Sequence, residues 1–155
     1  MIEIRPLAPV DIELVDGRLP LDRLDQPGGD WLVAWDREEP VGHAHVDWRP
    51  SPPQLQNVFV AETHRRRGVA SKLSIAAEEL VRSRGHRTIA LDVDVENTAA
   101  RSLYEKLGYR PAGTPPRRAH GTILLRGKPF SFDVMLLDLV KPLEGAVDFT
   151  QPRSS

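Results

Sequence analysis

Two successive segments in the middle of the chain each read as a strand that leads directly into a helix, and they restrict the fold more than any other feature. Residues 55–60 form an extended run, and apolar residues at helical spacing predict a helix over 71–84. Residues 88–95 alternate apolar and polar side chains as a half-buried strand does, and Asn97 then caps a second predicted helix that stops at Gly108. With strands on either side, this order predicts a mixed α/β or α+β sheet.

The remaining predicted elements are shorter. Strands are expected over residues 1–5, 31–35, 41–48, 109–113 and 130–140, and a short helix over 10–16. Residues 19–30 are expected to form a loop, and 114–129 an irregular stretch with a short strand at 122–125. We expect residues 1–141 to form a single domain and 142–155 a flexible tail.

Length and composition narrow the class of protein. The chain has 155 residues, of which 40% are apolar and 28% charged, enough for one domain with a substantial core. It has no cysteine, which excludes disulfides, thiolate metal sites and a cysteine nucleophile and fits a reducing compartment. It contains no uncharged apolar run of about 18 residues and begins without the apolar run of a signal peptide. We therefore expect a cytoplasmic protein with no membrane partner.

Charge is distributed unevenly along the chain. The net charge is only −1, which argues against a general nucleic-acid binder. Residues 64–87, however, hold seven Arg and Lys against two Glu, whereas residues 11–39 hold nine Asp and Glu against three Arg. The basic segment indicates an anion site, although solvated surfaces of opposite sign would give the same pattern.

The basic segment coincides with the junction between the first strand and its helix, residues 58–71. The first N–H groups of a helix have no partner within it, so the backbone of residues 66–71 could surround a phosphate or pyrophosphate. Gly68 and Ala70 leave room for close approach, and Arg65 to Arg67 add positive charge. A basic helix cap with an ordinary glycine turn is the alternative. The spaced glycines and the Gly-Lys-Ser/Thr of the common nucleotide-binding loops are absent from this segment.

The two strand–helix units together resemble one family. Arg65-x-x-Gly68-x-Ala70 is similar to the acyl-CoA pyrophosphate loop of the GNAT superfamily, the Gcn5-related N-acetyltransferases. Asn97, Ala100 and the run 103–109 (Leu-Tyr-Glu-Lys-Leu-Gly-Tyr) are similar to that family's second motif. The resemblance covers residues 55–113. It implies a mixed, mostly antiparallel sheet of about six to seven strands with splayed middle strands, flanked by about three to four helices.

The resemblance also implies the donor and its site. Acetyl-CoA would act as cosubstrate, with its pantetheine arm between strands 55–60 and 88–95 and its pyrophosphate on the 66–71 amides. Asn97 would contact the pantetheine, or act only as a helix cap. The residues implied in binding acetyl-CoA are Val58, Phe59, Val60, Arg65, Arg66, Arg67, Gly68, Val69, Ala70, Ser71, Asn97, Ala100 and Tyr104.

Two residues are implied in catalysis. Tyr104 matches the tyrosine that lies near the CoA sulfur in many relatives, and its hydroxyl would protonate the departing thiolate. Position alone favours an aromatic of the core, and the match to the family motif favours catalysis. Asp92 lies twelve positions earlier, where some relatives carry a functional glutamate, and would act as general base; an ion pair with an arginine is the alternative. Weaker candidates for the base are His43, His45, Glu62 and His120. His43 and His45 have no third ligand at sensible spacing, so no metal site is expected.

The acceptor side is expected to combine the 19–30 loop, the 31–48 hairpin and the 114–129 stretch. The acidic segment would favour a cationic amine. The acceptor stays open between a small amine and a protein N-terminus or lysine. A module that binds or senses acyl-CoA without catalysis is the alternative function. The first helix is short and no clear second helix follows it, unlike a typical relative, and proteins of this kind often dimerise through terminal strands.

Overall fold

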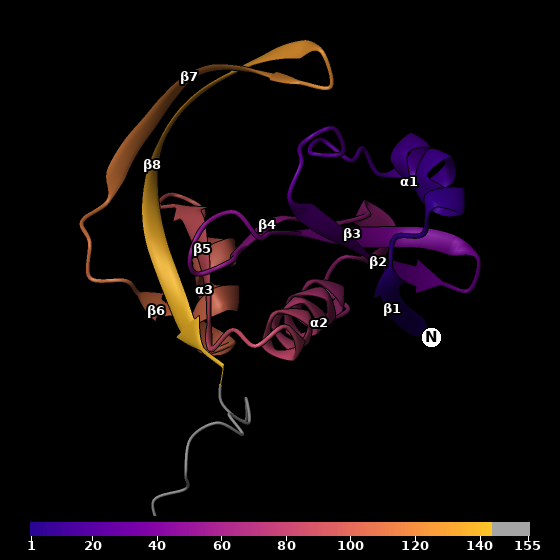
Figure 1. Ribbon diagram of the computed structural model, residues 1–155, viewed down its shortest axis with the longest axis horizontal. Coiled ribbons are helices and arrows are strands. Elements are labelled where there is room, and N and C mark those ends of the chain that lie inside the picture. The colour runs from indigo at the N-terminus through magenta and orange to yellow at the C-terminus, as the bar shows by residue number, and fades with distance from the viewer. Residues whose placement is uncertain (144–155) are drawn as a thin grey trace, which may run out of the picture.

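A strongly curved sheet of eight strands runs through the described part of the chain, residues 1–143 of a computed structural model (Figure 1). Its order is β1-β2-β3-β4-β5-β8-β6, with β7 also paired to β8, and every pairing is antiparallel except that of β4 with β5. The strands are β1 (Ile2–Pro6), β2 (Gly29–Asp36), β3 (Glu39–Asp47), β4 (Gln54–Val60), β5 (Thr88–Asp94), β6 (Arg110–Pro111), β7 (Arg117–Leu125) and β8 (Lys128–Pro142).

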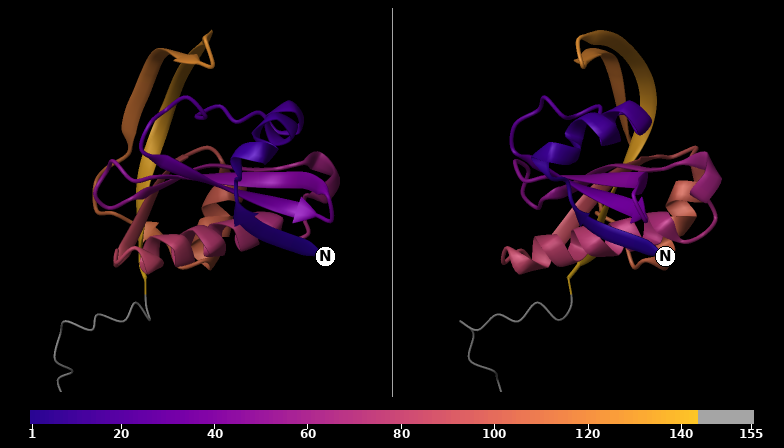
Figure 2. Two further views of the ribbon diagram at one scale, coloured as in Figure 1. Left: turned by 45° about the vertical axis from the view of Figure 1, so that its right-hand side comes forward. Right: turned by 90° about the vertical axis from the view of Figure 1, so that its right-hand side faces the viewer.

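Helices cover both faces of this sheet (Figures 1 and 2). They are α1 (Ile12–Arg18), α2 (Val69–Ser83) and α3 (Thr98–Lys106), with short 3-10 turns η1 (Pro9–Asp11) and η2 (Glu62–His64). The expected mixed, mostly antiparallel sheet is thus confirmed, with one strand more than expected and three α-helices. No helix in residues 1–143 has the length and apolar character needed to cross a membrane.

The main core lies between the sheet and α2. Apolar residues of α2 recur at helical spacing, and Leu73, Ala77 and Val81 are fully buried. Burial of a leucine or valine side chain, such as Leu73 or Val81, contributes about 1.5–3 kcal/mol to stability. Gly42 of β3 permits the close approach of α2, because a Cβ there would lie 2.9 Å from the Phe59 carbonyl oxygen and 3.1 Å from the Leu73 side chain. A second cluster under α1 contains Val15, Leu21, Trp31, Val33 and Trp35.

The sheet opens at its centre. β4 and β5 share only one residue pair, Gln54 with Ala90, and the Ala90 N–H donates to the Pro53 carbonyl at 3.0 Å. On their other sides β4 pairs with β3 and β5 with β8 over most of their lengths. From Leu55 onward β4 therefore presents an edge with no strand beside it. This is the expected splay of the two middle strands.

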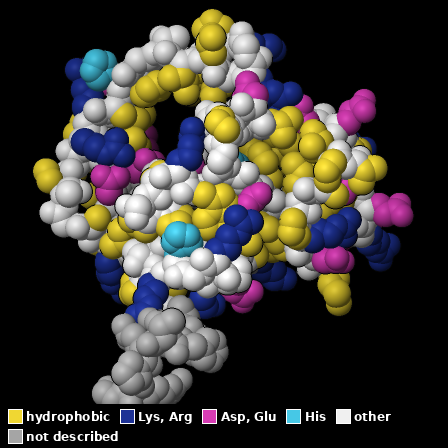
Figure 3. Space-filling model, in the orientation of Figure 1, with side chains coloured by type: hydrophobic (Ala, Val, Ile, Leu, Met, Phe, Trp, Pro, Cys, Tyr) yellow, Lys and Arg dark blue, Asp and Glu magenta, His cyan; other side chains and the backbone are white. Residues whose placement is uncertain are grey.

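The prediction that residues 114–129 form an irregular stretch was wrong. Instead of an irregular stretch with four strand residues, Arg117–Leu125 form β7, which pairs with β8 along its whole length. The resulting hairpin arches over the face that carries α1 (Figures 1 and 2), and Figure 3 shows an opening beneath the arch. The sequence gives no burial pattern for β7 because most of its residues are exposed.

Pro142 and Leu143, which were expected to begin the flexible tail, belong to the fold. Pro142 is the last residue of β8, and Leu143 is buried with its N–H donating to the Arg87 carbonyl at 2.9 Å. The rest of the expected tail, residues 144–155, lies outside the described residues.

Candidate functional site

Where β4 and β5 diverge, the structure contains a cleft of about 310 Å³, which we call the splay cleft. Both strands and α3 line it, together with one residue from the loop after α1. Five of the residues expected around acetyl-CoA or in catalysis meet there: Val58, Asp92, Asn97, Ala100 and Tyr104. The other lining residues are Arg23, Leu55, Gln56, Asn57, Leu91, Val93 and Asp94.

The turn between η2 and α2 places bare N–H groups beyond the end of β4. Arg66 and Gly68 both have positive φ, 64° and 78°, and α2 begins at Val69. The first bond of the helix runs from the Lys72 N–H to the Gly68 carbonyl at 3.1 Å, so the N–H groups of residues 69–71 have no acceptor within the helix. Space is open where a Gly68 Cβ would stand. The turn therefore combines donors, helix-end positive charge and room for an anion.

The three consecutive arginines do not act alike. The Arg65 Nε donates to the Val60 carbonyl at 3.0 Å, and its guanidinium lies 5.5 Å from the centre of the Phe59 ring. Arg65 therefore holds the turn against the end of β4. Arg66 and Arg67 are exposed beside the bare N–H groups, where their charge favours an anion.

The start of α3 lines the opposite side of the splay cleft. The Asn97 side-chain oxygen accepts the Ala100 N–H at 3.0 Å, which is the predicted helix cap. Asn97 also lines the cleft, so capping holds a polar side chain at the place where the resemblance puts the pantetheine.

Tyr104 is 9% exposed, and the face that remains open lines the splay cleft. Burial raises the pKa of the Tyr104 hydroxyl, and a contact with the Ser74 hydroxyl of α2 partly offsets this. The phenol is therefore protonated at neutral pH and can donate a proton. Its neighbour Tyr109, 5.4 Å away between ring centres, has a different environment, because its hydroxyl donates to buried Glu78 at 3.0 Å. Tyr109 thus belongs to the core.

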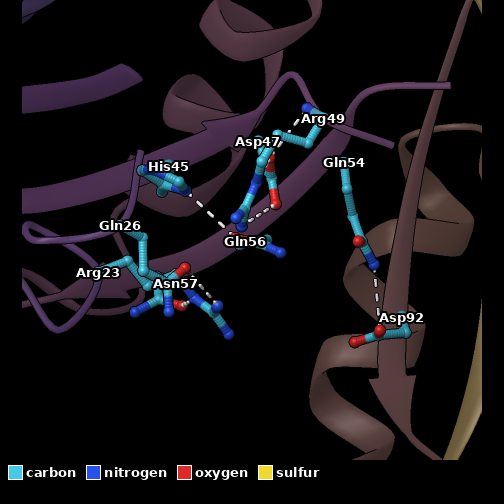
Figure 4. A network of polar contacts seen from close by, with 9 residues as sticks. All are labelled: Arg23, Gln26, His45, Asp47, Arg49, Gln54, Gln56, Asn57 and Asp92. Atoms are coloured by element: carbon cyan, nitrogen blue, oxygen red, sulfur yellow. Dashed lines mark hydrogen bonds and ion pairs between the residues drawn. The ribbon is translucent and has the colours of Figure 1, made fainter. Parts of the chain in front are cut away.

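Asp92 lines the splay cleft. It also forms an ion pair with an arginine, which was the alternative to its role as general base. Its Oδ2 accepts from Gln54 Nε2 at 3.0 Å and from the Arg117 guanidinium at 3.2 Å (Figure 4 shows the Gln54 contact). Arg117 also makes two bonds of 3.1 Å to Asp138, which lies directly opposite Asp92 in the ladder of β5 and β8. Two carboxylates side by side repel each other, so Arg117 neutralises a pair that the strand register creates.

A bulge in β4 was not predicted. His43 pairs with Phe59 but His45 with Gln56, so β4 has one extra residue, and Asn57 has a φ of 51°. An asparagine inside a strand pattern is the available signal, since asparagine tolerates this backbone conformation better than most residues. The Asn57 carbonyl lies 2.9 Å from His43 Nδ1.

The bulge joins the splay cleft to a second one of about 340 Å³, which we call the Asp22 cleft. Asn57 and Val58 line both. The other residues of the Asp22 cleft are Pro20, Asp22, His43 and Phe59. Phe59, 41% exposed, thus lines the Asp22 cleft, while its backbone belongs to β4.

The weaker candidates for a base fall into two groups. Burial lowers the pKa of His43 and of His45. It outweighs the acceptors that each ring contacts, which are the Asn57 and Pro20 carbonyls for His43 and the Gln56 side chain at 3.2 Å for His45. Both imidazoles are therefore neutral at pH 7. Glu62 and His120 line neither cleft. Within residues 1–143 no three His, Cys, Asp or Glu side chains are placed to share a metal ion.

The acidic segment 11–39 is dispersed by the fold. Asp16 pairs with Arg126 at 2.7 Å and Asp30 with Arg84 at 2.8 Å, and other carboxylates of the segment form similar pairs. Among the acidic residues of this segment, Asp22 lines one of the two clefts described above.

Comparison with known proteins agrees with this geometry. Residues 4–109 match the Acetyltransferase (GNAT) family. Mycothiol acetyltransferase of Corynebacterium glutamicum is 36% identical over 86 residues, which are 54% of this chain but only 29% of that protein. Aminoglycoside N(6')-acetyltransferase type 1 of Salmonella typhimurium is 29% identical over 69% of this chain and 78% of its own length.

Solved structures show the same fold at lower identity. The ribosomal-protein-S18-alanine N-acetyltransferase of Escherichia coli superposes with a TM-score of 0.69 at 19% identity, covering 92% of this chain and 94% of its own. Arabidopsis thaliana NAA60 in complex with acetyl-CoA gives 0.67 at 20% identity, covering 94% and 100%. Because the family match spans more than half of the sequence and includes the splayed strands, the Gly68 turn and the start of α3, the chain belongs to the GNAT acetyltransferase family.

Proposed function

We propose that this protein is an acetyl-CoA-dependent N-acetyltransferase that transfers the acetyl group directly to a primary amine. The observation that carries the proposal is the opening between β4 and β5, which share one residue pair and lead to the bare N–H groups of residues 69–71. An extended ligand with a diphosphate at one end fits such an opening, since the free β4 edge and the helix N-terminus each offer backbone hydrogen bonds.

The chain's residues would bind acetyl-CoA in two places. The N–H groups at the start of α2, with Arg66 and Arg67 beside them, would hold the pyrophosphate. The backbone of Val58 to Val60 would pair with the pantetheine amides, and Asn97 would contact the arm from the other side. The thioester would then lie at the inner end of the splay cleft, beside Tyr104.

Acetyl transfer would proceed in one displacement. The amine nitrogen attacks the thioester carbonyl carbon, the C–N bond forms and the C–S bond breaks. A backbone N–H near Val58 to Val60 would stabilise the developing charge on the carbonyl oxygen. Tyr104 would donate its proton to the departing thiolate, since burial keeps the phenol protonated.

Asp92 would take the proton from the amine, directly or through water. Gln54 and Arg117 both contact its Oδ2, so the proton would go to Oδ1. The same ion pair is the observation that favours the second candidate, a protein that binds acyl-CoA without turning it over.

A comparison of two tyrosine variants separates these functions. In Tyr104→Phe we expect unchanged affinity for coenzyme A by calorimetry and a loss of roughly 10²- to 10⁴-fold in kcat, measured as thiol release from acetyl-CoA with a panel of amines. Tyr109→Phe is the matched control, because it removes the neighbouring hydroxyl that faces Glu78 rather than the cleft. Coenzyme A binding without turnover of any amine by the unaltered protein would support the non-catalytic alternative.

A further inference from the structure

Arg23 brings a positive charge into the splay cleft from outside the two family motifs. It lies in the loop after α1, where a turn is closed by the Gln26 N–H donating to the Arg23 carbonyl at 3.0 Å. Leu21, two residues earlier, is fully buried against the strands under α1. The loop is therefore anchored to the core, and the position of Arg23 is fixed.

The Arg23 side chain is held by two neutral side chains. Its Nε donates to the Asn57 side-chain oxygen at 2.7 Å and its NH1 to the Gln26 side-chain oxygen at 3.2 Å (Figure 4). Within the part of the chain that the structure describes, no carboxylate forms an ion pair with it. A guanidinium has five N–H donors, so the remaining ones can bind a ligand in the cleft, and their fork matches a carboxylate.

Asp22, the preceding residue, lines the adjoining Asp22 cleft. The two clefts meet at Asn57 and Val58, so opposite charges stand side by side where they join. The Phe59 ring adds an apolar surface on the Asp22 side. An acceptor that fills this junction would meet an anion, a cation and an apolar wall.

We propose that the acceptor amine also carries a carboxylate, as an α-amino acid with an apolar side chain does. Arg23 binds the carboxylate, Asp22 attracts the ammonium group, and Phe59 contacts the side chain. The inference rests on the proposed acetyl transfer and adds the class of acceptor to it. The carboxylate is unchanged in the reaction, so Arg23 is a specificity-determining residue.

The test compares phenylalanine with phenylalaninamide, which keeps the amine and side chain but lacks the carboxylate. We expect the unaltered protein to prefer phenylalanine in kcat/KM. Arg23→Gln should lower kcat/KM for phenylalanine by roughly 10- to 100-fold, mainly through KM, because a hydrogen bond to a charged group is lost. The same variant should leave kcat/KM for the amide within about twofold, and Arg23→Lys should fall between the two.

Arg18→Gln is the matched control. It removes one arginine from the same region, but Arg18 pairs with Glu39 at the surface and lines neither cleft. Calorimetry with N-acetylphenylalanine and N-acetylphenylalaninamide in the presence of coenzyme A gives a readout independent of turnover, and Arg23→Gln should weaken only the former. Thermal unfolding confirms that each variant is folded.

The outcomes separate the two proposals. If amines are acetylated but Arg23→Gln affects the acid and the amide equally, or neither, the inference about the carboxylate is wrong and the acetyltransferase stands. If coenzyme A binds but none of the amines, including the amino acids, accepts an acetyl group, the proposed function fails and the inference falls with it.

Discussion

Replacing Gly68 by alanine should weaken coenzyme A binding as well as cause a modest loss of stability through backbone strain. Gly68 has a φ of 78°, and a Cβ added there meets nothing within 4 Å. The backbone strain of an L-residue in this region is roughly 1–2 kcal/mol, and for a chain of this size roughly 1 kcal/mol lowers Tm by about 2–4 °C. The added methyl group would instead occupy the space in which we place the pyrophosphate. Loss of one backbone hydrogen bond to a charged phosphate, roughly 1.5–3 kcal/mol, corresponds to about 10- to 150-fold in Kd.

Gly85→Ala is the control for this experiment. Gly85 lies at the other end of α2 with a φ of 87°, and a Cβ there also meets open space. Both variants should therefore lose similar stability in thermal unfolding. Calorimetric titration with coenzyme A should distinguish them, with Gly85→Ala within about twofold of the unaltered protein. Equal Kd values for the two variants would mean that the pyrophosphate is not held at the Gly68 turn, and the reasoning from bare helix N–H groups would be refuted.

Two further predictions concern the acceptor side. Asp22→Asn should raise KM for an amine acceptor several-fold, whereas Asp30→Asn should not, because Asp30 pairs with Arg84 away from both clefts; steady-state kinetics of the two variants checks this. The Arg126 hydrogen bond lowers the pKa of Asp16, so the contact between the β7–β8 hairpin and α1 should persist above the ordinary carboxyl pKa and be lost as pH falls through the lowered value. Protection of the hairpin-tip amides, measured as the exchange rate relative to the intrinsic rate at each pH, should fall over that acidic range, and Asp16→Asn should show low protection at every pH.

The elements predicted well are those in which burial is one-sided and local. Ile89, Leu91 and Val93 of β5 alternate with more exposed residues in the sequence and in the structure, because one face of that strand packs against the core. The Asn97 cap could also be predicted from the sequence, because a capping side chain accepts a hydrogen bond from a residue three positions away. Hydrophobic periodicity and helix caps depend on contacts between residues that are near in sequence. The segments that resemble the family are of this kind.

The features that sequence reasoning missed depend on contacts between distant residues. β7 is exposed over most of its length, so its strand conformation comes from the ladder with β8 rather than from an apolar pattern. Arg117 reaches Asp92 only because the register of β5, β8 and β7 brings together residues 25 positions apart. Arg23 and Asn57, 34 positions apart, meet because of a bulge that no periodicity indicates. Strand register and loop placement are therefore the information that the linear pattern lacked.

The net charge of a sequence segment did not predict the electrostatic field at the site, and this affects how an acceptor would be selected. The excess of acidic residues over 11–39 suggested long-range attraction of a cation. In the fold Asp16 and Asp30 are paired with arginines distant in sequence, which cancels much of that field. Salt screens what remains beyond the Debye length of about 8 Å at physiological ionic strength. Of the charged residues in 11–39, Asp22 and Arg23, one acid and one base, line the two clefts. At a distance their opposite charges cancel, whereas close to the clefts each acts on the group nearest to it. We therefore infer that the site discriminates acceptors by the placement of charges within the bound molecule and not by its net charge.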